Sequence, residues 1–303
     1  MVEEAANALF PVYRELHHQA AAGSLLFIDD TPAQILELGK PRSDSPEDST
    51  RQGAFTTGIL SRIGEHWVAL YLSGPRHAGE NVRELLASRP EDLPPPIQMS
   101  DALSRNLLPS QLVVLGLCLV HSRRNFFEIR DFYPEVCQQV LETIKAVYQH
   151  EAAIQEQQLS PTQRLAYHQE ESLPLLQQLR DWLSQQMEVR EIEPNSALGK
   201  ATAYFLKHWK GLTGFCRIAG APLDNNPAER MLKLAILLRK NCYFFKTEHG
   251  AAVGGILMSL IQTARLAGAN PFHFLETLLT RPREVRQAPG LWLPWNYRAQ
   301  LTG

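Results

Sequence analysis

The chain has 303 residues, 44% of them hydrophobic and 20% charged, which suits the core of one large domain or of a domain with an insertion. A net charge of −2 argues against a stand-alone DNA-binding module, which would normally be basic. No apolar run reaches the ~18 residues of a membrane span, and the N-terminus carries two glutamates in place of a basic signal start. The four scattered cysteines form no CxxC pair and predict reduced thiols without a zinc site. We therefore expect a cytoplasmic protein with no membrane partner.

The first 120 residues alternate between strand and helix patterns. A helix over residues 1–22 leads into an apolar run from Ser24 to Ile28, with a weaker run at Ile35–Leu38. The polar stretch 39–53 is typical of a loop. Further on we expect a hairpin of Phe55–Ile63 and Trp67–Leu72, a helix at Ala78–Ser88, a strand at Ile97–Ser100 and a central strand within Leu112–Val120.

From about residue 123 to 212 the pattern becomes wholly helical. Leucines recur at intervals of three and four, as at Leu173, Leu176, Leu179 and Leu183, which is typical of amphipathic helices. The expected helices are Phe126–Gln157, Pro161–Met187 and Ser196–Leu212. We interpret this stretch as an all-helical insertion. After it we expect helices at Asn226–Arg239, Gly254–Leu266 and Pro271–Leu279, and an aromatic tail, Leu291–Tyr297, docked on the core.

Three carboxylates stand at positions suited to chemistry. Asp29 and Asp101 each follow a short apolar run, and Glu229 lies in the first turn of an expected helix, on the face opposite Met231. Distant carboxylates gathered into one pocket could hold two Mg²⁺ ions for phosphoryl transfer. Taken singly, however, such an aspartate is more often a turn former or cap, and such a glutamate complements the helix dipole. Strand alternation does not decide which of Asp29 and Asp30 would bind metal.

The residues around these carboxylates resemble the insertion sequence 66 family of bacterial DDE transposases, over the catalytic region from about Leu25 to Tyr297. The most specific element is Asp224–Arg230, with the sequence Asp-Asn-Asn-Pro-Ala-Glu-Arg. The other matching segments are Asp29–Pro32, Gln98–Asp101, Cys118–Arg124, Arg239–Asn241, Phe244–Phe245, Gly250–Ala252, Ser259–Ile261, Pro271 and Leu293–Asn296.

This resemblance implies an α/β fold with a ribonuclease-H-like, retroviral-integrase-like mixed sheet and a large helical insertion before the last catalytic helix. The expected parts are 1–121 as the first part of the catalytic core, 122–212 as the insertion, and 213–303 as the final catalytic helix and tail. Asp29, Asp101 and Glu229 correspond to the catalytic, metal-binding triad. Two Mg²⁺ ions, with Mn²⁺ as a substitute, are the implied cofactors.

Residues beside the triad are candidates for DNA contact or support. The DNA-binding candidates are Arg123, Arg124, Arg230, Lys233, Arg239 and Lys240, for which a solvated helix face is the alternative. The accessory candidates are Asp30, His121, Asn225 and Asn226. His121 would touch the active site or a phosphate, or be structural. Asn225 and Asn226 stand first of all at a helix cap.

The function implied is metal-dependent DNA cleavage and strand transfer during transposition. DNA, as transposon ends and target, is the expected partner, with a homo-oligomer on DNA and accessory proteins of the element. Only 28 residues precede Asp29, and no DNA-binding segment of the family type lies among them, so we expect that part to be missing. The alternatives are a non-catalytic remnant that binds DNA or an intact transposase, and a stand-alone ribonuclease-H-like nuclease.

Overall fold

The structure is a computed structural model, and it describes residues 2–38 and 53–301. The expected loop at 39–53 lies almost wholly outside the described residues. The chain forms two compact units. We call the first the sheet unit, made of Met1–Gln98, Leu103–Val114 and Asn226–Gly303, and the second the helical unit, made of Met99–Ala102 and Leu115–Asn225.

The fold is mixed α/β with a five-stranded sheet in the order β3-β2-β1-β4-β5. Strands β1, β2 and β3 form an antiparallel meander. The strands are β1 (Leu25–Ala33), β2 (Ala54–Ile63), β3 (His66–Gly74), β4 (Ile97–Ser100) and β5 (Val114–Leu117). The predicted hairpin and the strand at 97–100 are confirmed.

Two strand predictions are wrong in extent. The run Leu112–Val120 was expected to be a central strand, but β5 covers only Val114–Leu117 and stands at one end of the sheet order. The run is apolar for another reason, since its last residues enter a helix whose first residue, Leu119, is buried. At the other weak run, Ile35 makes a single parallel bridge with Phe245 instead of a strand.

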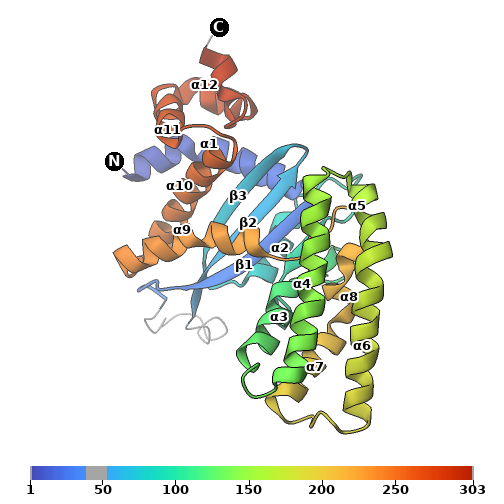
Figure 1. Cartoon of the computed structure of the whole chain (residues 1–303). Helices are drawn as coiled ribbons and strands as arrows, with labels where there is room; N and C mark the ends of the chain where they lie inside the picture. The colour runs from blue at the N-terminus through green and yellow to red at the C-terminus, as the bar shows by residue number, and fades with distance from the viewer. Residues whose placement is uncertain (1, 39–52, 302–303) are drawn as a thin grey trace. The chain divides into compact units, whose positions relative to one another are not determined.

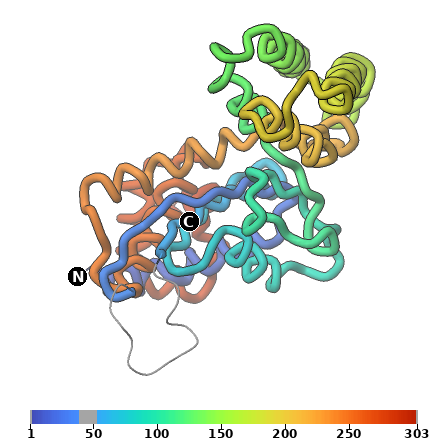
Figure 2. Tube along the Cα trace, turned by 90° about the horizontal axis from the view of Figure 1, so that it is seen from below, coloured from blue at the N-terminus to red at the C-terminus, as the bar shows by residue number. Residues whose placement is uncertain are grey.

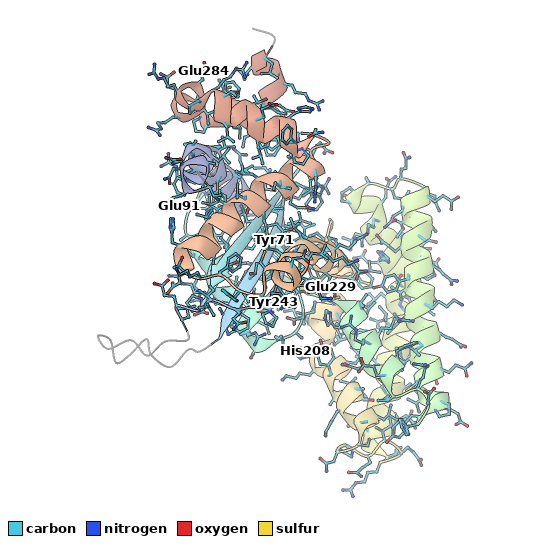
Figure 3. All side chains as sticks on the ribbon, turned by 90° about the vertical axis from the view of Figure 1, so that its left-hand side faces the viewer. Tyr71, Glu91, His208, Glu229, Tyr243 and Glu284 are labelled. Carbon is cyan, nitrogen blue, oxygen red and sulfur yellow. The ribbon has the colours of Figure 1, made fainter. Side chains whose placement is uncertain are left out.

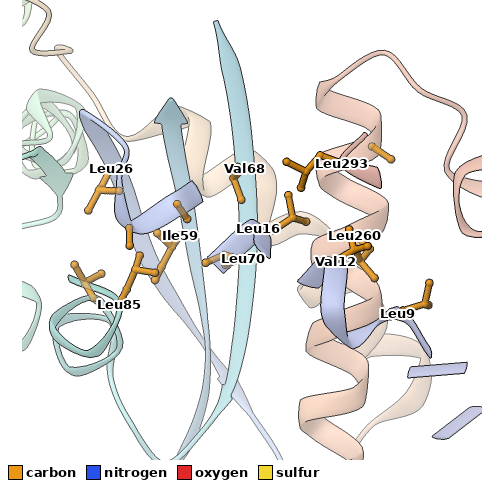
Figure 4. Packing of buried hydrophobic residues seen from close by; sticks show 14 of the residues in the cluster. Leu9, Val12, Leu16, Leu26, Ile59, Val68, Leu70, Leu85, Leu260 and Leu293 are labelled. Atoms are coloured by element: carbon orange, nitrogen blue, oxygen red, sulfur yellow. The ribbon is translucent and has the colours of Figure 1, made fainter. Parts of the chain in front are cut away.

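The sheet unit has its main core on one face of the meander. Leu26 and Ile28 of β1, with Ile59, Val68 and Leu70, pack against the N-terminal helix and α2 (Figure 4). The C-terminal tail joins this core through buried Trp292, Leu293 and Tyr297, as predicted. The helices are α1 (Val2–Ala21), α2 (Ala78–Leu86), α9 (Asn226–Cys242), α10 (Glu248–Leu266), α11 (Pro271–Thr280) and α12 (Pro282–Gln287), with short 3-10 turns at Ser104–Asn106, Pro289–Trp292 and Tyr297–Leu301.

The helix α10 protects the outer edge of β3. The hydroxyl of Ser259 accepts the peptide N–H of Tyr71 at 2.9 Å, and that of Thr263 accepts the N–H of Ala69 at 3.0 Å. Gly255 lies one turn earlier, and a Cβ there would be 2.5 Å from the Tyr71 oxygen. Because an unpaired edge invites association with other chains, this helix stabilises the sheet and also shields it.

The helical unit is built mainly from the helices between Leu119 and Cys216. Its elements are α3 (Leu119–Glu128), α4 (Pro134–Glu156), α5 (Pro161–Tyr167), a π-helical turn (His168–Ser172), α6 (Leu173–Glu188), α7 (Ala197–Lys207), α8 (Trp209–Leu212) and a 3-10 turn (Gly214–Cys216). Figure 2 looks nearly along α4 and α6. Leu176, Leu179 and Leu183 are buried, as their spacing predicts.

All three of the predicted long helices are interrupted, and the stretch 196–212 divides into α7 and α8 at His208. The stretch 126–157 divides into α3 and α4, because Pro134 starts a new helix where it lacks the N–H that an interior position needs. The stretch 161–187 contains the π-helical turn, where buried His168 bonds Ser172 and Glu151 at 2.9 Å each. Periodicity alone did not show this turn, because the apolar spacing continues across it.

Candidate active site

Asp29 lies in the middle of β1 and belongs to a row of paired residues across the sheet. It pairs with Gly58 on β2, which in turn pairs with Tyr71 on β3. Directly paired residues point to the same face of a sheet. The apolar run Ser24–Ile28 predicts a strand that ends at Asp29, and this prediction was wrong, because pairing with β2 continues as far as Ala33. The carboxylate is half-buried, and its Oδ1 accepts the N–H of Asp30 at 2.8 Å.

Helix α9 packs on the face of the sheet that carries Asp29. The Tyr71 hydroxyl donates to the Met231 oxygen at 2.7 Å. At Gly58, a Cβ would lie 2.7 Å from Met231 Cε and 2.9 Å from Leu232 Cδ2, so only glycine permits this approach. Glu229 lies two residues before Met231, and Figure 3 labels it with Tyr71. The fold thus brings Asp29 and the helix of Glu229 together within the sheet unit.

Asp30 points to the opposite face and supports the fold. Its Oδ1 accepts the Thr57 hydroxyl at 2.6 Å, and its Oδ2 accepts the Ala78 N–H at 2.9 Å, at the start of α2. His77 Nδ1 is 3.6 Å from Oδ2, and the Asp30 side chain is only 4% exposed. A carboxylate at a helix N-terminus stabilises the helix by capping its free N–H groups. Both Asp30 oxygens are therefore occupied by structural bonds, in contrast to a carboxylate placed for substrate.

Glu229 is half-buried on the flank of the buried stripe of α9. That stripe consists of Ala228, Met231, Leu232 and Ala235. Lys233 is exposed, one turn after Glu229. We expected Glu229 on the face of α9 opposite Met231. Instead, Glu229 lies at the edge of the buried stripe, where the helix meets solvent.

The predicted basic residues around α9 divide into two kinds. Arg239 donates to the Thr31 hydroxyl at 3.1 Å and to the Pro32 oxygen, which fastens the end of α9 to β1. Arg230 is exposed and its Nε bonds the Asn226 oxygen of its own helix at 3.3 Å. Lys233 and Lys240 are exposed. Arg239 therefore has a structural role in this fold, while the other three cations remain on the surface.

Asp101 belongs to the helical unit, where it lies beside Tyr204 of α7. Burial raises the pKa of Tyr204 to about 12, with the charges of Asp101 and Cys118 acting in the same direction. A main-chain hydrogen bond from Ala102 acts in the opposite direction. The sequence did not identify Tyr204 as a site residue, because a tyrosine in an amphipathic helix belongs to no recognisable motif.

Cys118, the first residue of the matching segment Cys118–Arg124, lies beside the start of the 224–230 segment in the helical unit. Cys118 is buried, its Sγ accepts the Asn225 N–H at 3.2 Å, and burial raises its pKa to about 11. A thiol that stays protonated at neutral pH is a poor metal ligand. The Tyr148 hydroxyl donates to Asp224 Oδ2 at 3.0 Å. Cys118 therefore holds Asn225 in place, while His121 is half-buried in the first turn of α3.

The remaining predicted residues lie nearby along the chain. Asn225 is buried and Asn226, the first residue of α9, is half-buried. Arg123 is half-buried with its guanidinium 5.3 Å from the Phe127 ring centre, and Arg124 is exposed.

A sequence profile described as "Transposase IS66 family" matches residues 1–253, which is most of the chain. The chain belongs to the IS66 family of transposases. Asp29, Asp101 and Glu229 all lie within the matched range.

Two relatives from Sinorhizobium fredii illustrate the extent of this IS66-type sequence. The uncharacterized protein y4jD is 34% identical over 196 residues, covering 62% of this chain and 37% of the relative. The uncharacterized protein y4hP is 30% identical over 200 residues, covering 61% and 36%. The chain thus spans little more than a third of the length of these relatives. No solved structure matches it.

The candidate metal ligands of this chain are all carboxylates. Asp29, Asp101 and Glu229 offer carboxylate oxygens, the ligands that Mg²⁺ prefers. Within residues 2–38 and 53–301, no group of three or more His, Cys, Asp or Glu side chains is already gathered as a metal site. The same part of the chain holds no helix long and apolar enough to cross a membrane.

Proposed function

We propose that this chain provides the catalytic carboxylates of an IS66-type DDE transposase on a ribonuclease-H-like core. The observation that carries the proposal is the row Asp29–Gly58–Tyr71 with α9 packed on it. This row places the carboxylate of Asp29 on the face of the sheet that packs against α9, the helix that carries Glu229. The meander β3-β2-β1 followed by β4 and β5, with acids on β1, after β4 and on α9, supports the fold assignment.

The proposed metal ligands are Asp29, Asp101 and Glu229. Two Mg²⁺ ions, or Mn²⁺ in their place, would stabilise the attacking and leaving oxygens of an in-line displacement at phosphorus. Asp29 is held by its strand pairing and by the N–H of Asp30. Glu229 is held by the packing of Met231 and Leu232 on Gly58. Such fixed supports are what a preorganised phosphoryl-transfer site requires.

The proposed reaction has two steps, hydrolysis and then transesterification. In the first, water attacks a phosphodiester at the transposon end, a new P–O bond forms, and the bond to the 3′ oxygen breaks and leaves a 3′-hydroxyl. In the second, that hydroxyl attacks a target phosphodiester, joins the two strands and releases a target 3′-hydroxyl. Exposed Arg230, Lys233, Lys240 and Arg124 are proposed as phosphate contacts, which add affinity without sequence specificity.

The test is nicking and joining of a supercoiled plasmid that carries DNA flanking the encoding gene, with Mg²⁺ or Mn²⁺ and the full chain. We expect activity that Asp29→Asn, Asp101→Asn and Glu229→Gln each reduce by about a thousandfold. Cleavage without joining would favour a nuclease instead. Equal activity in the three variants would overturn the assignment of these residues.

A further inference from the structure

The helical unit contains a groove between α3 and α4 with a volume of about 720 Å³. Its apolar lining comes from Val120 on α3 and from Pro134, Leu141 and Tyr148 on α4. The α4 residues that line it recur at intervals of three and four, so one face of this long helix borders the groove. We propose that this groove binds an unpaired nucleotide of DNA.

Charge favours a nucleic-acid occupant. The groove is lined by three cations, Arg123, Arg130 and Lys145, and by one acid, Glu142. The carboxylate of Glu142 already accepts a hydrogen bond from Gln138 at 2.8 Å. Arg130 also pairs with exposed Asp131 at 3.7 Å, so Arg123 and Lys145 supply the remaining positive charge. The net charge around the groove is still positive and attracts phosphate, although the whole chain carries −2.

Arg123 and Arg130 both stack near the ring of Phe127. The guanidinium of Arg130 lies 3.9 Å from the centre of the Phe127 ring, and that of Arg123 lies 5.3 Å from the same centre. Arg130 also donates to the Phe127 oxygen at 2.7 Å. Stacking on a ring fixes the plane of a guanidinium and leaves edge N–H groups for phosphate. Less side-chain entropy is then lost on binding.

The shape of the groove selects an unpaired base over a duplex. A groove of about 720 Å³ can hold a single nucleotide but is too small to enclose a duplex. Bases taken out of a duplex are typically held between apolar or aromatic side chains with cations on the phosphates. Val120, Leu141 and Tyr148 supply such walls. Phe132 lies in sequence between the lining residues Arg130 and Pro134, and its ring is an additional aromatic surface because it is 81% exposed.

The inference rests on the proposed function for the identity of its partner, and fluorescence anisotropy tests it directly. The probes are a labelled perfect duplex, the same duplex with one bulged nucleotide, and a single strand, each titrated with the full chain at two salt concentrations. We expect the bulged duplex and the single strand to bind about tenfold more tightly than the perfect duplex.

Three variants give the sharpest readout. Lys145→Ala, at an exposed position, should weaken all binding about threefold to tenfold and lower the salt slope by about 1. Gln138→Trp should fill the groove and remove the preference for the bulged duplex while keeping the salt slope. The control is Lys200→Ala, an exposed lysine on α7 outside the groove lining, which should change neither. Circular dichroism of each variant checks that the helices are retained.

The groove proposal is overturned if bulged and perfect duplexes bind equally, or if Gln138→Trp keeps the preference. Its failure is distinguishable from failure of the proposed function. A chain that nicks plasmid DNA through Asp29 but shows no bulge preference contradicts the groove alone. A chain that prefers bulged DNA, loses this preference in Gln138→Trp and never nicks contradicts the catalytic assignment alone.

Discussion

Tyr71 on β3 donates its buried hydroxyl to the main-chain oxygen of Met231 on α9, at 2.7 Å. This bond connects the row that carries Asp29 to the helix that carries Glu229. Burial raises the pKa of Tyr71 well above its usual value, so the hydroxyl keeps its proton in the ordinary pH range. The bond therefore stabilises the proposed site throughout the neutral pH range.

We expect Tyr71→Phe to lower the free energy of unfolding by about 1 kcal/mol, because a buried hydrogen bond is lost while the ring remains. Urea unfolding measures this change. Plasmid nicking should also fall, since α9 loses a constraint beside Glu229. The matched control is Tyr243→Phe, whose ring is 73% exposed, and it should leave stability unchanged. Equal stability of the two variants would contradict the role of Tyr71.

Gly58→Ala should displace α9 from the sheet. The new methyl group would lie 2.7 Å from Met231 Cε and 2.9 Å from Leu232 Cδ2, and overpacking of this kind costs about 1–3 kcal/mol. Thermal unfolding and plasmid nicking should both decline. Gly74→Ala on β3 is the control, because a Cβ there meets no atom within 4 Å. If Gly58→Ala were as stable and active as Gly74→Ala, the close approach would not matter.

The adjacent aspartates should separate stability from catalysis. Asp30→Ala removes the acceptor of the Thr57 hydroxyl and the Ala78 N–H, so we expect a loss of about 2 kcal/mol in unfolding free energy. Asp29→Asn should abolish nicking and change stability by less than about 1 kcal/mol. The reverse pattern would indicate that Asp30, and not Asp29, faces the substrate.

Glu151 should make the helical unit sensitive to acid. Burial acts to raise its pKa, but the hydrogen bond with His168 and the charge of Arg164 outweigh it, so the pKa is lowered in the folded state. A lowered pKa gives stability that is complete above the unfolded value of about 4.3 and is lost as pH falls through the folded pKa. Glu151→Gln should therefore be less stable than the wild type near neutral pH, with a difference that shrinks below pH ~4. Glu156→Gln, exposed on the same helix, should show no such trend in thermal unfolding.

Tyr243 should be replaceable by glycine with a gain in stability. It follows α9 with φ of 60°, the left-handed conformation that usually holds glycine at a helix end, and its N–H bonds the Arg239 oxygen at 2.8 Å. We expect Tyr243→Gly to raise the unfolding free energy by about 0.5–1 kcal/mol. Tyr243→Ala keeps the strained conformation, so it should not show the gain. A loss with glycine would show that the exposed ring contributes packing.

The sequence could predict the elements whose patterns are local. The β2–β3 hairpin, β4 and the leucine stripe of α6 follow from apolar spacing, and the buried tail follows from its aromatic residues. The position of β5 and the division of α3 from α4 did not follow, because a continuous apolar run does not record where a strand changes into a helix. These limits come from tertiary packing, which overrides local pattern.

The sequence could name candidate carboxylates for the site but not the residues that support them. Motif residues identified Asp29, Asp101 and Glu229 as candidates, but strand alternation alone did not separate Asp29 from Asp30. The register with Gly58 and the contacts of Thr57 and Ala78 separate the two aspartates. Tyr71 and Tyr204 carry no motif, and their roles depend on pairing and burial across long separations.

Calorimetric titration of Mn²⁺ into the full chain mixed with DNA tests the proposal that Asp29 and Glu229 bind metal. We expect saturable uptake of about two ions per chain. This uptake should be lost in Asp29→Asn and Glu229→Gln and retained in Asp30→Asn, with circular dichroism confirming that each variant is folded. Uptake that is unchanged in Asp29→Asn and Glu229→Gln, or no uptake by the wild-type chain with DNA, would contradict it.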